Sequence, residues 1–122
     1  MKADDHFHTG VATTDMAATA ATLSATLGYE WGDRIGSVVQ VTVAGGVTDI
    51  ELSCMFSINE PRLEVVRAVS GTLWEPVPGG GIHHVGYWSD DVAADVTELI
   101  RHGWQVEATR KTPDGALHFA FL

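Results

Sequence analysis

Two histidines, His8 and His84, are the side chains of this sequence best suited to binding a metal ion. Each is followed two residues later by a glycine, Gly10 or Gly86, which lies on the same face of an extended strand and leaves space beside the imidazole. Glu64 adds a carboxylate within an apolar run, where burial without a partner is costly. Two imidazoles and one carboxylate suit borderline divalent metals such as Zn²⁺, Fe²⁺, Co²⁺, Ni²⁺ or Mn²⁺.

Each of these residues also has an ordinary structural interpretation. A single histidine at a strand end is commonly exposed or hydrogen-bonded, and Glu64 on an edge strand could face water. Strand alternation places His83 on the face opposite His84, which predicts a surface or helix-packing residue. The metal interpretation therefore depends on evidence that His8 and His84 are brought together.

An internal repeat supplies that evidence. His8–Leu23 aligns with His84–Leu99 at a constant offset, as HTGVATTDMAATAATL over HVGYWSDDVAADVTEL. After a single-residue gap, the glycine-aromatic segments 28–30 (GYE) and 103–105 (GWQ) align as well. Alanine-rich helices align easily by chance, but the histidine, aspartate and glycine matches share one register. We therefore expect two copies of one structural unit.

Each copy has the pattern of a strand, an acidic turn, a helix and a glycine stop. Apolar residues recur with helical spacing at Met16, Ala20, Leu23 and Leu27 in the first copy. Asp15 and Asp91 stand at favoured N-cap positions, and Gly28 and Gly103 stand at favoured C-terminal positions.

Strand-like runs follow both helices. The first copy has them at 37–43, 48–57 and 62–69, and the second has them at 104–110 and 116–122. In the shared unit, an aromatic-led strand follows the glycine that stops the helix. The sequence thus predicts one α+β domain over 1–122, with a βαβββ module at 5–69, a linker at 70–81 and a second module at 82–122. The second module is one strand short.

The amino-acid composition and net charge narrow the kinds of binding partner that the sequence predicts. The 122 residues have a formal net charge of −9, which disfavours nucleic acid and anionic membranes as partners. Cys54 is the single cysteine, so we expect neither a disulfide within the chain nor a cysteine-rich zinc site. Neither a signal peptide nor a membrane-spanning segment is indicated, which makes the cytoplasm the expected location.

The stretches FHTGVATTDMAATAATLSATLGY, RLEVVRAV and GGGIHHVGYWSDDVAADVTELIRHGW resemble the vicinal oxygen chelate superfamily, which includes glyoxalases, bleomycin-resistance proteins and extradiol dioxygenases. The similarity is greatest to the glyoxalase-like branch that contains methylmalonyl-CoA epimerase. It implies that the modules pair into a curled mixed sheet around a cavity, with the helices outside. It also implies a homodimer and a divalent metal held by His8, Glu64 and His84. The family's fourth ligand, in the last strand, has no counterpart here.

The resemblance implies a metal-dependent isomerase, epimerase or glyoxalase-type lyase that moves a proton next to a carbonyl of a small metabolite or acyl thioester. Glu51 is the candidate base, and Trp88, Gly10 and Gly86 are candidate pocket residues. One alternative is a metal-free protein that binds a small molecule or drug, as in the bleomycin-resistance branch. A less favoured one is an extradiol-type dioxygenase using Fe²⁺, in which His118 would assist.

Overall fold

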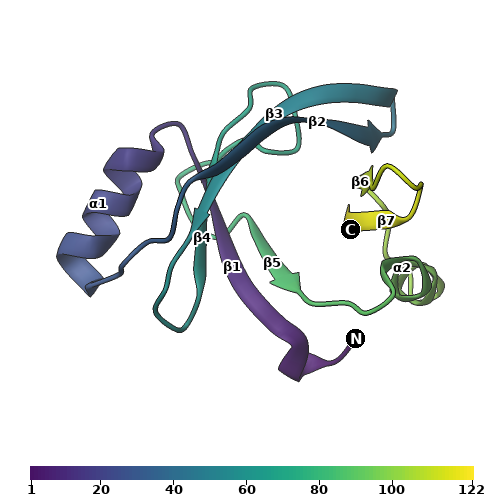
Figure 1. Ribbon diagram of the computed structural model, residues 1–122, viewed down its shortest axis with the longest axis horizontal. Coiled ribbons are helices and arrows are strands. Elements are labelled where there is room, and N and C mark those ends of the chain that lie inside the picture. Colours follow the sequence, from purple (N-terminus) through teal and green to yellow (C-terminus); the bar gives the residue numbers. More distant parts are fainter.

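The computed structural model describes all residues, 1–122, and contains two α-helices and seven strands (Figure 1). A short 3₁₀ turn, Ala3–Asp5, precedes β1. The first half then comprises β1 (His6–Thr13), α1 (Met16–Leu27), β2 (Ile35–Val43), β3 (Gly46–Phe56) and β4 (Leu63–Arg67). The second half comprises β5 (His84–Tyr87), α2 (Val92–Arg101), β6 (Ala108–Lys111) and β7 (Leu117–Phe121).

All seven strands form one curled mixed sheet in the order β5-β1-β4-β3-β2-β6-β7. Only β1 and β4 pair in parallel; the other pairs are antiparallel. The two halves join at two places, because β1 pairs with β5 and β2 pairs with β6. The predicted α+β class and the curled mixed sheet are therefore confirmed, and the curl is visible in Figure 1.

The second half lacks a counterpart of β4. In the first half, β4 lies between β1 and β3, which are the equivalents of β5 and β7. No strand lies between β5 and β7, so each of them has only one neighbour in the sheet. The predicted shortfall of one strand is confirmed, and it leaves two unpaired strand edges.

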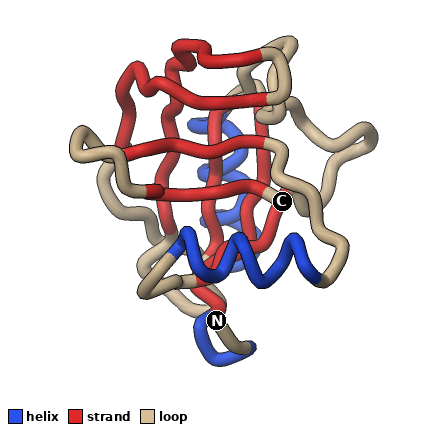
Figure 2. The backbone as a smooth tube through the Cα atoms, turned by 90° about the vertical axis from the view of Figure 1, so that its right-hand side faces the viewer, coloured by secondary structure: helices blue, strands red, loops and turns tan.

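The helices lie outside the curl, as expected (Figure 2). The side chain of Asp15 accepts a hydrogen bond from Ala18 N at the start of α1, and Asp91 accepts one from Ala94 N at the start of α2. Gly28 ends α1 in the left-handed conformation, with φ 74°. α1 contacts β4, and α2 contacts β7. Neither helix is long and apolar enough to cross a membrane.

The main hydrophobic core occupies the concave face of the sheet. Its buried members are Ala12, Val39, Val41, Ile50, Val66, Trp74 and Ala108. Trp74 belongs to the 70–81 linker and is only 2% exposed, so the linker folds back and contributes a large side chain to the core. Because alternate residues of a strand share a face, His8 lies on the same concave face as Ala12, and Glu64 on the same face as Val66.

The aromatic-led strands expected directly after the two helices start late. After Gly28, Trp31 makes one isolated bridge to Ser57, and β2 starts only at Ile35. Likewise β6 starts at Ala108 rather than at Trp104. Trp104 is 54% exposed. Its high β propensity has no effect there, because no neighbouring strand pairs with this part of the chain.

Candidate metal centre

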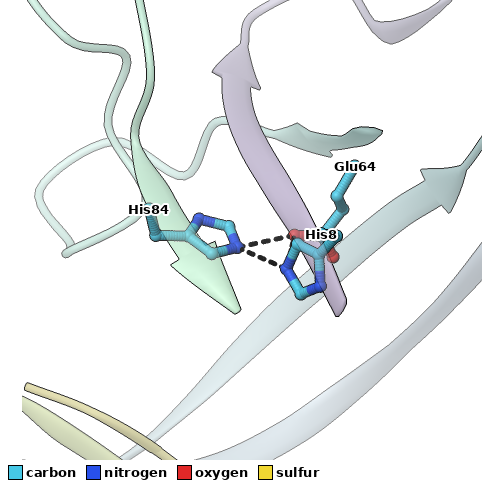
Figure 3. A group of neighbouring side chains, drawn as sticks. All are labelled: His8, Glu64 and His84. Carbon is cyan, nitrogen blue, oxygen red and sulfur yellow. Dashed lines mark hydrogen bonds and ion pairs between the residues drawn. The ribbon is translucent and has the colours of Figure 1, made fainter. Parts of the chain in front are cut away.

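His8, Glu64 and His84 point toward one another from three adjacent strands (Figure 3). The distance from His84 Nε2 to Glu64 Oε2 is 2.8 Å, and the two histidine Nε2 atoms are 3.0 Å apart. His8 Nε2 lies 3.4 Å from Glu64 Oε2. The three side chains are only 11–14% exposed. The structure thus brings together all three residues that the sequence predicts as ligands.

Strand register explains this convergence. Gly10, on β1, is paired in register with Glu64 on β4 and with His84 on β5. His8 is paired with Gly86 across the β1–β5 ladder. Residues 76 positions apart in sequence therefore become direct neighbours. The site exists because β1 is the shared central strand of the three.

The two glycines make room for the two imidazoles, in a reciprocal manner. A Cβ atom on Gly10 would overlap the ring of His84, and a Cβ atom on Gly86 would overlap the ring of His8. The sequence predicts free space beside each histidine, but each space is filled by the imidazole from the opposite module. Glycine is required at both positions because any larger side chain would displace the imidazole ring packed against it.

The arrangement fits a divalent cation. Ligand atoms about 2.0–2.1 Å from a tetrahedral metal lie about 3.3 Å from one another, close to the 2.8–3.4 Å observed here. Carboxylate oxygen has only lone pairs, and a neutral imidazole has a lone pair on one nitrogen. A cation would satisfy the converging lone pairs.

The electrostatics of the cluster keep the carboxylate charged. Burial acts to raise the pKa of Glu64. It is outweighed by the hydrogen bonds that Nε2 of His8 and of His84 donate when those nitrogens carry a hydrogen, and by positive charge on the two rings, which lower the pKa to about 2. Cys54 shows the opposite behaviour. Burial, with the adjacent charge of Glu64, raises the pKa of the Cys54 thiol to about 12. Cys54 is thus a neutral thiol beside an anionic carboxylate.

Aromatic rings surround the cluster. The His8 ring lies 5.0 Å from Phe7 and 5.2 Å from Phe56, and the His84 ring lies 5.2 Å from Phe121, measured between centroids. The β1–β5 register shifts between His6 and His8, so Phe7 is an extra, bulged residue beside the site. Trp88, a predicted pocket residue, is 63% exposed and reaches the site only through its contact with Phe7 at 4.4 Å.

Two other predicted residues lie away from the cluster. Glu51 is 67% exposed and forms an ion pair with Arg67 at 3.1 Å. It alternates along β3 with Ile50 and Leu52, which face the core, so Glu51 faces the outside of the sheet. That alternation was present in the sequence and argues against an inward Glu51. His118 is exposed on β7 and is not part of the cluster.

His83 is a neighbour of the site that the sequence pattern missed. It was expected at the surface or against a helix, yet its Nδ1 lies 2.9 Å from His84 Nδ1. Its Nε2 lies 2.7 Å from the carbonyl oxygen of Leu73 in the linker. The only sign of this contact in the sequence is that the two histidines are adjacent. Strand alternation predicts that adjacent side chains point to opposite faces, so it did not suggest the contact.

Comparison with known proteins agrees with this architecture. A family model described as the glyoxalase/bleomycin resistance protein/dioxygenase superfamily matches residues 7–121. The match spans His8, His84, Glu64 and all seven strands except His6, the first residue of β1. Comparison with curated proteins gave no match.

Proposed function

Because the chain belongs to the glyoxalase/bleomycin resistance protein/dioxygenase superfamily, we propose that it is a divalent-metal-dependent isomerase, epimerase or glyoxalase-type lyase. Its substrate is a small carbonyl compound or acyl thioester, and its reaction is proton transfer at the carbon next to the carbonyl. His8, Glu64 and His84 hold the metal, which is Zn²⁺, Co²⁺, Ni²⁺, Mn²⁺ or Fe²⁺.

One observation carries this proposal: two imidazole nitrogens and one carboxylate oxygen meet within 3.4 Å on the concave face. They come from three strands whose register leaves glycine opposite each imidazole. A histidine that is only hydrogen-bonded does not need a second histidine beside it or a glycine packed against its ring. The donor set is instead typical of a catalytic metal site with positions left for substrate.

A divalent ion bound there supplies stabilisation of the negative charge that develops on a carbonyl oxygen when the adjacent carbon loses a proton. The protein's own contribution is to keep Glu64 anionic and the cluster only slightly exposed. Phe7, Phe56 and Phe121 limit the access of water and strengthen electrostatic interactions at the cluster. Glu51 has no role in this proposal because it lies on the outer face.

A homodimer in the cytoplasm is part of the same proposal. Its support is the resemblance, together with apolar side chains exposed on and beside β5: Ile82, Val85, Tyr87 and Trp88. Light scattering of the purified protein tests the dimer, and a monomeric mass across the accessible concentration range would contradict it. Cell fractionation tests the location, which recovery with the membrane or secreted fraction would contradict.

Elemental analysis of freshly purified protein tests the metal assignment. We expect about one equivalent of divalent metal in the wild type, retained or restored after incubation with Zn²⁺, Co²⁺, Ni²⁺ or Mn²⁺. His8→Ala and His84→Ala should lose it, whereas His118→Ala, an exposed histidine on β7, should retain it. A wild type that takes up no metal would instead support the alternative, a metal-free binding protein.

Solvent-deuterium exchange then tests the reaction class. Metal-loaded protein should incorporate deuterium at the acidic carbon of small acyl thioesters or 2-oxo compounds in D₂O, and His84→Ala should not. Consumption of dioxygen with a catechol substrate, without deuterium incorporation, would favour the extradiol alternative. The exposed position of His118 argues against that alternative.

A further inference from the structure

His83 lies between the metal cluster and the linker. Its backbone N–H donates to Gly10 O at 2.8 Å, which fixes the residue on β1. Its ring stands perpendicular to the ring of His84, at an interplanar angle of 90°. The ring touches a polar atom on each side: His84 Nδ1 at 2.9 Å and Leu73 O at 2.7 Å.

These two contacts determine where the protons lie when both rings are neutral. A carbonyl oxygen can only accept, so Nε2 of His83 carries a hydrogen and donates it to Leu73 O. A neutral imidazole has a single N–H, which leaves Nδ1 of His83 as an acceptor. His84 must then donate from its own Nδ1. Consequently, Nε2 of His84 has a free lone pair directed at Glu64 and His8.

We propose that His83 is a positioning residue that holds His84 in the Nδ1–H tautomer through the chain Leu73 O, His83, His84, and so prepares His84 Nε2 to bind the metal. The purpose of this arrangement rests on the proposed metal-dependent function; the tautomer itself does not. Ligating histidines commonly use their second ring nitrogen in this way, and the bond fixes both tautomer and ring orientation.

The competing interaction in the metal-free protein makes this control necessary. Glu64 Oε2 lies 2.8 Å from His84 Nε2 and would readily accept a hydrogen from that nitrogen. Without an acceptor at Nδ1, the Nε2–H tautomer would be favoured, and its hydrogen would have to be displaced before metal could bind. His83 removes that obstacle by offering His84 Nδ1 an acceptor of its own.

The acceptor at the far end of the chain is anchored in the core. Val69 N donates to Trp74 O at 2.9 Å, and Thr72 Oγ1 donates to Val69 O at 2.6 Å, so the turn that presents Leu73 O is closed on itself. Trp74, the next residue, is 2% exposed within the hydrophobic core. The linker thus supplies a rigid acceptor rather than a mobile one.

The first module has no equivalent of the hydrogen-bonded chain from Leu73 O through His83 to His84. By the internal repeat, the residue matching His83 is Phe7, which cannot accept a hydrogen bond. Nδ1 of His8 is correspondingly buried and without a partner. The two ligating histidines therefore differ: a neighbour gives His84 an acceptor at Nδ1, whereas His8 has acceptors only at Nε2, from Glu64 and His84, and keeps its hydrogen there.

Nitrogen-15 NMR of the metal-free protein at pH 8.5 tests the tautomer directly. We expect the His84 ring to show its hydrogen on Nδ1 in the wild type and in His83→Asn, whose amide oxygen can take the place of the Nδ1 acceptor. His83→Leu should shift the hydrogen to Nε2. A wild-type His84 with its hydrogen on Nε2, or no shift in His83→Leu, would overturn the proposal.

Metal affinity tests the consequence. Loss of such a partner commonly weakens binding about 10- to 100-fold, so we expect that decrease for Zn²⁺ or Co²⁺ in His83→Leu. His83→Asn should recover most of the loss, and His83→Gln should recover little because its amide reaches only toward Leu73. His102→Leu, an exposed histidine on α2's end, is the matched control.

The NMR experiment and the metal-affinity experiment test the positioning role of His83 and the proposed metal-dependent function separately. If the wild type binds no metal, the proposed function fails, while the NMR result still decides the tautomer. If metal binds but His83→Leu and His83→Asn bind it as tightly as the wild type, the positioning role is wrong and the metal assignment stands.

Discussion

At the scale of single residues, the decisive property of the site is the charge of Glu64. A carboxylate with an 11% exposed side chain is unfavourable unless it is paired. Here two imidazoles within 3.4 Å supply the pairing. The same contacts would attract a cation, and they make the metal-free protein sensitive to acid.

The acid sensitivity has a defined direction. The folded-state pKa of Glu64, about 2, lies below its ordinary value of 4.5, so the stabilisation is complete above pH 4.5 and is lost as the pH falls toward 2. At about 1.4 kcal/mol per pKa unit, the free energy of unfolding should fall by about 3 kcal/mol relative to Glu64→Gln between pH 7 and pH 2. Urea denaturation in the presence of a chelator measures this difference.

Glu107→Gln is the control for that experiment, because Glu107 is exposed. It should follow the wild-type pH dependence. Parallel curves for wild type and Glu64→Gln would mean that Glu64 is not held as a charged group in the folded state.

Cys54 should be chemically inert in the folded, metal-free protein. With a pKa of about 12, only about one thiol in ten thousand is ionised at pH 8, and the thiolate is the reactive form. Ellman's reagent should therefore react with Cys54 in urea but hardly at all under native conditions. Equal rates in the two conditions would show that burial and Glu64 do not suppress ionisation.

How much of the site could be predicted differs from residue to residue. His8 and His84 could be paired from the sequence because a repeat records equivalent positions without any structure. The role of His83 could not, because it depends on ring rotation and on a carbonyl from a distant turn. Phe7 was also hidden, since a bulge changes which way a side chain faces and strand alternation assumes there is none.

At the scale of elements, the β1–β5 pair builds most of the site. Gly10 faces the ring of His84, and Gly86 faces the ring of His8. Both contacts depend on the register that pairs His8 with Gly86 and Gly10 with His84. A change in either glycine should act on the histidine of the other strand.

Gly10→Ala and Gly86→Ala should each weaken metal binding while the fold is retained. Overpacking costs about 1–3 kcal/mol, equivalent to a loss of about 5- to 150-fold in affinity if the whole cost falls on the metal-bound geometry of the ring. Calorimetric titration with Zn²⁺ measures the affinity, and circular dichroism checks the fold. Gly45→Ala is the matched control, because a Cβ there would meet nothing within 4 Å. Unchanged Zn²⁺ affinity in both variants would show that glycine is not needed at positions 10 and 86 to hold the two imidazoles in place.

The helices were predictable because their signals are local. Asp15 and Asp91 cap helix starts, and Gly28 ends one, through contacts within a few residues. Strand limits were less predictable, because a strand ends where its partner ends. Trp104 has strong β propensity, but β6 pairs with β2 only from Ala108 onward.

At the scale of the whole molecule, the proposed metal would join the two modules. Its ligands come from β1 and β4 of the first module and from β5 of the second. β5 has four residues and pairs only with β1, so few other contacts hold this strand to the rest of the sheet. Metal binding should therefore be strongly coupled to folding.

Thermal unfolding should reveal that coupling. At a free metal concentration 100 times the Kd, the folded state should gain about 2.7 kcal/mol, seen as a higher Tm that a chelator reverses. His84→Ala should show no such gain, while His118→Ala should behave as the wild type. A metal-independent Tm for a wild type that demonstrably binds metal would show that the unfolded chain binds it equally well.

The unpaired edges of β5 and β7 have a consequence for the behaviour of the protein in solution. β7 reads LHFAF, without a proline or an acidic residue, and its free edge is a template on which a strand of another molecule could add. The net charge of −9 opposes such contacts by mutual repulsion. That repulsion vanishes near the isoelectric point of about 4.8 and is screened by salt. The acidic composition therefore opposes the addition of one molecule's edge strand to another's, and this opposition is weakest near the isoelectric point and at high salt.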